Sequence, residues 1–118
     1  MTKSDMNIKQ KALAHFKSKL SGELQKLHVA EWDCDIYYRA TSSMSTEAKI
    51  LKLTTDGKTA EALVESIIQK SLDADGKRVF HDTDRASLMN EVDPQVLVKV
   101  ATALNNANSD SIGAIEKN

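Results

Sequence analysis

The chain has 118 residues, of which 41% are hydrophobic and 28% are charged, and these ordinary values exclude a chain that is mostly disordered. Its 16 basic and 17 acidic residues nearly cancel, so no overall charge favours binding to nucleic acid or to an anionic membrane. The single cysteine, Cys34, excludes an intramolecular disulfide framework and a cysteine-based zinc cluster. We expect one small globular domain over residues 1–104 and a polar, mobile tail over residues 105–118.

The sequence predicts neither a membrane segment nor a leader. No apolar run exceeds three residues, whereas a membrane-spanning helix needs about 20. Residues 1–5 lack the apolar run of a signal peptide. We therefore expect a soluble protein of the cytoplasm.

Residues 5–20 are predicted to form the first helix, because Lys, Gln and Ala favour helix and apolar residues recur on one face. Apolar residues also stand at every seventh position from Met6 to Leu27, a spacing that fits a coiled-coil seam. We prefer a helix that packs on its own domain, because Lys9 stands where the seam needs a second apolar residue.

The segment 27–41 holds three of the five aromatic residues and predicts a small antiparallel hairpin. Aromatic and β-branched residues flank a turn expected at residues 33–35. In the second strand, Ile36 and Tyr38 share one face. An isolated hairpin is marginal in water, so we expect it to lean on the helices.

The rest of the domain, residues 46–104, is predicted to be helical. Residues 46–53 fit either a short helix capped by Ser45 or Thr46 or a third strand, and we prefer the helix because Glu, Ala and Lys favour it. Residues 58–72 carry the strongest helical pattern, with Glu65 expected outside the core. Its expected apolar face consists of Ala60, Leu63, Val64, Ile67, Ile68 and Leu72.

The acidic sequence at residues 73–76 is interpreted as a helix stop, with Gly76 taking a positive φ. A calcium loop with Gly76 at its sixth position would place Ser71 at the first ligand position and Asp82 in place of the bidentate glutamate. Both residues are poor choices for those positions. We therefore expect no calcium site here.

Two more helices complete the predicted fold. Asp82 or Thr83 caps a short helix that ends near Asn90. Pro94, preceded by an aspartate, begins the last helix, which ends near Leu104. Their expected core residues are Leu88, Met89, Val96, Leu97, Val100, Ala101 and Leu104, together with Phe80 from the preceding insert. The fold class is therefore α+β, mainly helical, with four or five helices and one small hairpin.

No pattern in the sequence predicts catalysis, a metal or a cofactor. The three histidines, His15, His28 and His81, fall in different predicted elements. Cys34 lies between two acidic residues, which disfavour a reactive thiolate. The four glycines are scattered, so no phosphate-binding loop is present. The lysines of the first helix are more simply its solvated face than a nucleic-acid interface.

Several features follow one another between residues 27 and 105. They are Trp32, the strand Ile36-Tyr37-Tyr38-Arg39, a helix over 60–72 that runs into the sequence LDADGKRVF, a short helix over 82–90, and a final helix over 94–105. In this order they resemble the tail assembly chaperones of long-tailed bacteriophages. The N-terminal helix has no counterpart in the resemblance.

The resemblance implies a non-catalytic protein of the infected host cytoplasm, without cofactors. Such chaperones bind the tape-measure protein and recruit tail tube subunits, and self-association is possible. The family is made in a short and a longer form, and an extension would join after Leu104. Two other classes remain open: a phage tail or head–tail component retained in the virion, and a small helical adaptor or regulator that binds an amphipathic peptide.

The aromatic hairpin is the predicted partner-binding surface. Trp, Tyr and Arg dominate the energetics of protein interfaces, and Trp32, Tyr38 and Arg39 concentrate these types in one short region. The alternative is that Trp32 and Tyr38 only anchor the hairpin to the helices. The predicted partners are proteins, with neither nucleic acid nor membrane among them.

Overall fold

The structure is a computed structural model that describes the backbone of residues 3–117 and the side chains of residues 7–106. Over these residues the chain forms five α-helices, two short 3₁₀ helices and one two-stranded antiparallel sheet. This composition confirms the predicted fold class. The helices are α1 (Lys3–Leu20), α2 (Met44–Thr55), α3 (Thr59–Lys70), α4 (Arg85–Asn90) and α5 (Pro94–Lys117), and the strands are β1 (Gln25–Val29) and β2 (Cys34–Tyr38).

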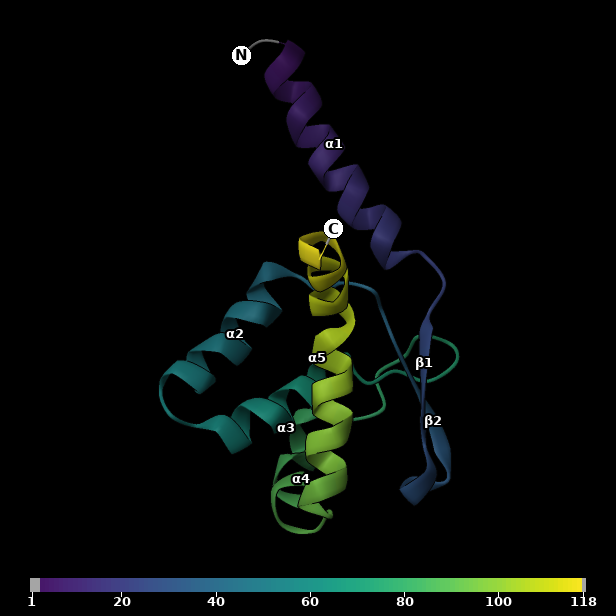
Figure 1. Ribbon diagram of the computed structural model, residues 1–118, viewed down its shortest axis with the longest axis vertical. Helices are drawn as coiled ribbons and strands as arrows, with labels where there is room; N and C mark the ends of the chain where they lie inside the picture. The colour runs from purple at the N-terminus through teal and green to yellow at the C-terminus, as the bar shows by residue number, and fades with distance from the viewer. Residues whose placement is uncertain (1–2, 118) are drawn as a thin grey trace.

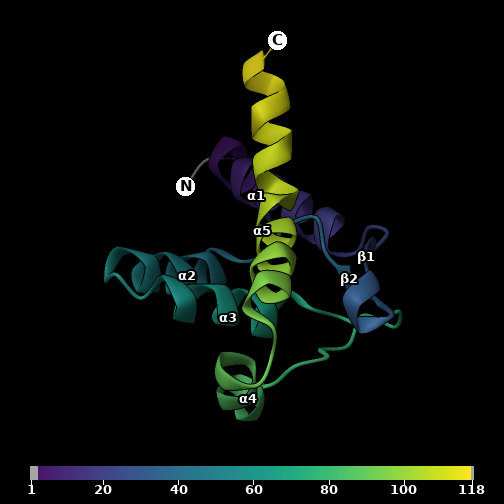
Figure 2. The ribbon, with the colours of Figure 1, turned by 60° about the horizontal axis from the view of Figure 1, so that its bottom comes forward.

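Helix α5 stands at the centre of the molecule, with the α2–α3 pair on one side and the hairpin on the other (Figures 1 and 2). Helix α3 contacts α5, α2 and α4. Helix α1 projects from one end of the longest axis, and α4 lies at the opposite end (Figure 1). The principal extents of 54 × 34 × 32 Å reflect this projection.

Helices α3 and α5 supply most of the core. Both predicted apolar faces are buried except at Ala60, which is exposed in the first turn of α3. The core cluster consists of Val29, Ile36, Val64, Ile67, Ile68, Leu88, Val96, Leu97, Val100, Ala101 and Leu104. Leu63 and Phe80 are half-buried and pack against its edge. The hairpin contributes Val29 and Ile36, so the core joins all parts of the fold except α1 and α2.

The prediction that Glu65 lies outside the core is wrong, since this residue is only 3% exposed. Its carboxylate forms an ion pair with Arg85 Nη1 of α4 at 2.8 Å and accepts a hydrogen bond from Gln69 Nε2 at 2.7 Å. A buried charge is tolerated when it is paired and hydrogen-bonded. The ion pair therefore lets α3 bury a wider face than its apolar residues alone define.

The hairpin turn differs from the prediction. A 3₁₀ helix (Ala30–Trp32) forms the turn, and Asp33 closes it with a φ of 51°. Cys34 and Asp35 already belong to β2, in the register Val29↔Cys34 to Gln25↔Tyr38. Aspartate is one of the few residues that tolerate the left-handed region, so the turn is completed at Asp33 instead of at residues 33–35.

The hairpin leans on the segment that follows α3. The backbone N–H of Tyr37 donates to the carbonyl of Leu72 at 2.9 Å, and the N–H of Leu72 donates to the carbonyl of Tyr37 at 2.7 Å. Helix α3 therefore ends at Lys70, whereas the sequence predicted an end at Leu72. The difference arises because Leu72 pairs with Tyr37 in extended backbone conformation. Gly76 has the expected positive φ, +82°, but it sits in the turn after this bridge and not at the helix end.

The start of α2 differs from the prediction by a few residues. The cap is Ser43, whose Oγ accepts a hydrogen bond from the backbone N–H of Thr46 at 3.2 Å. Neither predicted cap, Ser45 or Thr46, has that role, because both already lie within the first turn of α2.

The last two helices also depart from the prediction. A 3₁₀ turn (Asp82–Asp84) precedes α4, and Met89 is 41% exposed instead of facing inward. Helix α5 continues to Lys117, so residues 105–117 are helical where a tail was expected. This segment contains no proline, which would remove a helical hydrogen bond and end the helix.

Candidate partner-binding surfaces

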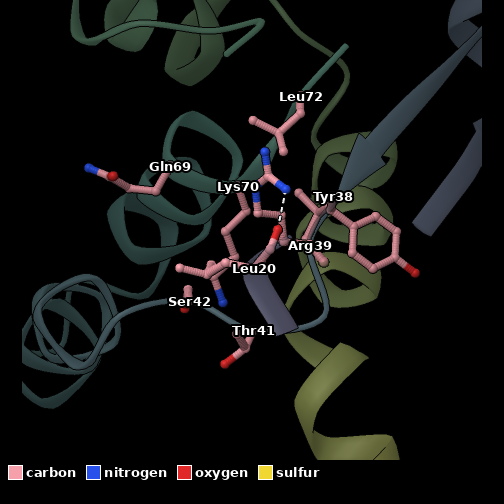
Figure 3. A pocket seen from close by; sticks show the side chains of 9 residues that line it. Leu20, Tyr38, Arg39, Thr41, Ser42, Gln69, Lys70 and Leu72 are labelled. Carbon is pink, nitrogen blue, oxygen red and sulfur yellow. Dashed lines mark hydrogen bonds between the residues drawn. The ribbon is translucent and has the colours of Figure 1, made fainter. Parts of the chain in front are cut away.

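Arg39, directly after β2, fixes the end of α1 (Figure 3). Its guanidinium donates a hydrogen bond to the backbone carbonyl of Leu20. The last carbonyls of a helix lack helical partners and carry the negative end of its dipole, so Arg39 caps α1. A Cβ on Gly76 would lie 3.0 Å from Arg39 Nη2, which shows that the turn after α3 closes over the guanidinium.

A cavity of about 170 Å³ lies beside Arg39, where α1, β2, α3 and α5 meet. Lys70, whose side chain is only 10% exposed, contributes to its wall. Lys70 Nζ contacts Glu47 Oε2 at 2.8 Å and donates to Asn105 Oδ1 at 2.9 Å. Lys70 is therefore held by two partners that lie outside the lining. We call the place where these four elements meet the joint. The lining residues are Leu20, Tyr38, Arg39, Thr41, Ser42, Gln69, Lys70, Leu72 and Leu104.

Glu47, at the start of α2, titrates differently from an exposed glutamate. Burial raises the pKa of its carboxyl, but hydrogen bonds from Lys70 and Ser42 and the charge of Lys70 lower it by more. The pKa therefore lies below its ordinary value. The pair ties α2 to the end of α3.

The structure brings two of the three predicted interface residues together. Tyr38 and Arg39 both line the joint described above. Trp32 ends the 3₁₀ turn at the other end of the hairpin, and the five residues of β2, which span about 13 Å, lie between that turn and Arg39. Trp32 and Tyr38 are half-buried against the edge of the core. The three residues therefore do not form one patch, and their role in binding stays a prediction.

An apolar groove of about 370 Å³ lies between α3, α4 and α5. Val64, Leu88 and Leu97 form its buried floor, whereas Met89 and Val98 are 41% and 45% exposed. The sequence prediction did not identify this groove. A signal was present in Val98, because three consecutive apolar residues, 96–98, span about 200° of a helix and cannot all face one core. The remaining lining residues are Ala60, Leu63, Asn90, Val92 and Pro94.

The surroundings of the groove are acidic. Glu61, Glu91 and Asp93 are exposed, and each adjoins a lining residue in sequence. Within residues 7–106, none of the three takes part in an ion pair. The other charged neighbours, Glu65 and Lys99, are paired with residues elsewhere in the fold. The groove thus has an apolar floor, and we call the three acidic residues that adjoin its lining in sequence its acidic rim.

Helix α1 has the opposite character. Residues 7–20 contain four lysines and no acidic residue. Residues 7–15 are all exposed, including Ile8 at 67% and Leu13 at 60%. The preferred interpretation that this helix packs on its own domain is therefore wrong: only Phe16 and Leu20, near its end, are half-buried. Leu20 lines the cavity at the joint, and the exposed residues 7–15 extend away from the core.

Among the described side chains, the titratable groups add no further candidate site. Among the side chains of residues 7–106, no three of His, Cys, Asp or Glu gather in a way that would hold a metal. His28 Nδ1 contacts Asp35 Oδ1 at 2.8 Å across the exposed face of the hairpin, and Cys34 is exposed beside them. None of the helices within residues 3–117 is long and apolar enough to cross a membrane.

Comparison of the chain with models of protein families, with curated proteins and with solved structures finds no match.

Proposed function

We propose that this protein is a non-catalytic chaperone of phage tail assembly. In this proposal it acts in the host cytoplasm, binds an amphipathic helix of the tape-measure protein and recruits tail tube subunits, without a cofactor. The tape-measure protein is a long helix whose apolar stripe must stay covered until the tube forms around it. A chaperone for it needs an open apolar surface that is matched to a helix.

The observation that carries the proposal is the groove between α3, α4 and α5. A helix lying in an apolar groove inserts side chains spaced three and four residues apart, and the groove offers a volume of about 370 Å³ over a buried floor. Val98 and Met89 lie at its open side, where a bound helix would cover them. The acidic rim favours a client segment whose apolar stripe is flanked by Lys or Arg.

The test is co-expression with the long helical protein encoded by the neighbouring gene, followed by capture through a tag on this chain. We expect the wild type and Leu51→Glu to capture that protein and Val98→Glu to lose it. Leu51 is the matched control, because it is a 65% exposed apolar residue in α2 outside the groove. The proposal fails if the wild type captures nothing, or if both variants reduce capture equally.

A second measurement separates a chaperone from a structural component of the virion. Protein analysis of purified phage particles detects a component that is retained and misses a chaperone that has been released. We expect this chain to be present in the infected cell and missing from the finished particle. Its presence in particles at a fixed copy number would support the structural alternative.

A further inference from the structure

We propose that the cavity at the joint binds the carboxylate of a ligand that also has a small apolar body. Such a ligand is either a free carboxylic acid or the C-terminal end of a polypeptide that finishes in an apolar residue. The inference does not rest on the proposed function, because the cavity and the groove between α3, α4 and α5 share no lining residue. Each can therefore fail separately.

Arg39 supplies a positive charge that no described carboxylate balances. Within residues 7–106 it takes part in no ion pair, and its hydrogen bond to the Leu20 carbonyl uses a single nitrogen, Nη1 (Figure 3). Among the same residues, Ser71 Oγ is the one buried side-chain polar atom without a partner, so the other guanidinium nitrogens are open to solvent. A guanidinium with open N–H groups favours a carboxylate held by two parallel hydrogen bonds.

The rest of the polar lining adds a donor and no competing anion. The Lys70 ammonium contacts Glu47 and Asn105, which leaves one of its N–H groups unused. Among the described residues, no carboxylate lines the cavity. The nearby carboxylate of Glu47 already binds Lys70 and Ser42. An anion that enters the cavity therefore meets the unbalanced charge of Arg39.

The cavity also has an apolar wall, which selects more than a bare anion. Leu72 and Leu104 are buried at 7% and 2% exposure, and Leu20 is half-buried. The volume of about 170 Å³ is close to the roughly 150 Å³ of an apolar cavity that holds benzene. The space thus fits a body of about six carbon atoms. Inorganic phosphate would leave the leucine side chains uncovered.

The site is largely formed before a ligand arrives. The Leu20 carbonyl holds the guanidinium of Arg39 from one side, and the turn at Gly76 closes over Nη2, since a Cβ there would lie 3.0 Å away. A side chain that is already fixed loses little conformational entropy when a ligand binds. Because the lining comes from α1, α3 and α5 as well as Arg39, a bound ligand would also join the end of α1 to the body.

The test is a titration of the purified, isotopically labelled full chain with phenylacetate, followed by NMR. Phenylacetate joins a carboxylate to a ring of six carbons. We expect saturable shifts of the amide signals around the cavity and a Kd of about 1 mM, as is reasonable for a ligand of about ten non-hydrogen atoms. Phenylacetamide, the neutral analogue, and acetate, which lacks the ring, should each bind about tenfold more weakly or worse. Failure of phenylacetate to bind, or equal binding of either analogue, overturns the proposal.

A pair of arginine variants locates the site. Arg39→Lys keeps the charge and a donor for the Leu20 carbonyl but loses the two-bond geometry, so the affinity for phenylacetate should fall about tenfold. The matched control is Arg78→Lys, because Arg78 also donates to a helix-end carbonyl, that of Ile68, at 2.9 and 3.2 Å, yet lies outside the cavity. This control should bind as the wild type does. A folded Arg39→Lys with unchanged affinity overturns the proposal, and if that variant unfolds, the analogues decide the question on the wild type.

A peptide identifies the source of the carboxylate. An acetylated tetrapeptide that ends in leucine presents the same two groups at the end of a chain. Tighter binding of this peptide than of phenylacetate assigns the site to a protein C-terminus, and weaker binding assigns it to a free acid; both results support a carboxylate site. The same peptide with an amidated C-terminus should bind about tenfold more weakly or worse. Equal binding of the two peptide forms overturns the proposal.

Discussion

The ion pair between Glu65 and Arg85 predicts a sharp difference between removing one partner and removing both. The Glu65 side chain is 5% exposed and depends on Arg85, 2.8 Å away, for its counter-charge. Arg85→Met keeps the aliphatic stem of the side chain and leaves the carboxylate with only the Gln69 amide. Breaking a buried pair in this way costs about 3–5 kcal/mol. We expect about 2–3 kcal/mol here, since Arg85 is 37% exposed and water can replace part of its contribution.

This loss is measured by urea denaturation followed by circular dichroism, with an unchanged denaturant dependence as the check that only stability has changed. For a domain of this size it corresponds to a fall of about 10 °C in Tm. The matched control is Asp82→Asn, which removes the other, exposed contact of Arg85 at 3.2 Å. This control should cost less than about 0.5 kcal/mol.

The double variant Glu65→Leu/Arg85→Met separates the pair from its surroundings. It removes both charges, so no uncompensated carboxylate stays in the core, and we expect it to be more stable than Arg85→Met alone. Two results would refute the reasoning. One is a loss below about 1 kcal/mol for Arg85→Met. The other is a double variant whose loss equals the sum of the two single losses.

Two further predictions concern the joint beside Arg39. Since the pKa of Glu47 is lowered in the folded protein, its pairing with Lys70 stabilises the fold above the ordinary pKa of about 4.3 and is lost as the pH falls below that value. Urea midpoints should therefore fall less steeply with acidification in Glu47→Gln than in wild type, and parallel profiles would contradict this. Gly76→Ala should be more destabilising than Gly57→Ala by chemical denaturation: both glycines have positive φ, but a Cβ meets Arg39 only at Gly76 and nothing within 4 Å at Gly57. Equal losses would mean that Arg39 moves aside freely.

The sequence predicted correctly those elements that are determined by residues close together in the chain. The apolar spacing of α3 and α5 identified their buried faces, and Pro94 marked the start of α5. The partner of Glu65 is 20 positions away in another element, so no helical pattern could show that this carboxylate is buried. Several hydroxyl residues precede α2, and only the backbone path selects Ser43 as the cap.

The candidate surfaces were harder to predict, because each depends on what the rest of the chain does not cover. Leu13 has the same spacing whether α1 packs on its own domain or projects from it, and only the tertiary contacts decide. The exposure of Met89 and Val98 likewise depends on how α4 approaches α3 and α5. Tyr38 and Arg39 are consecutive in the sequence, but their neighbour in the joint, Lys70, comes from α3, and no local pattern could place it there.

The direction in which α1 points depends on the hairpin as well as on α1 itself. Arg39 follows β2 directly, and side chains alternate between the faces of a strand, so a slip of one residue in the pairing would carry its guanidinium to the opposite face. The Leu20 carbonyl would then lose its donor. The pairing frame is in turn fixed by the turn that Asp33 closes at a φ of 51°. The backbone conformation of Asp33 in the hairpin thus influences the direction of the whole helix α1, which has 18 residues and is about 27 Å long.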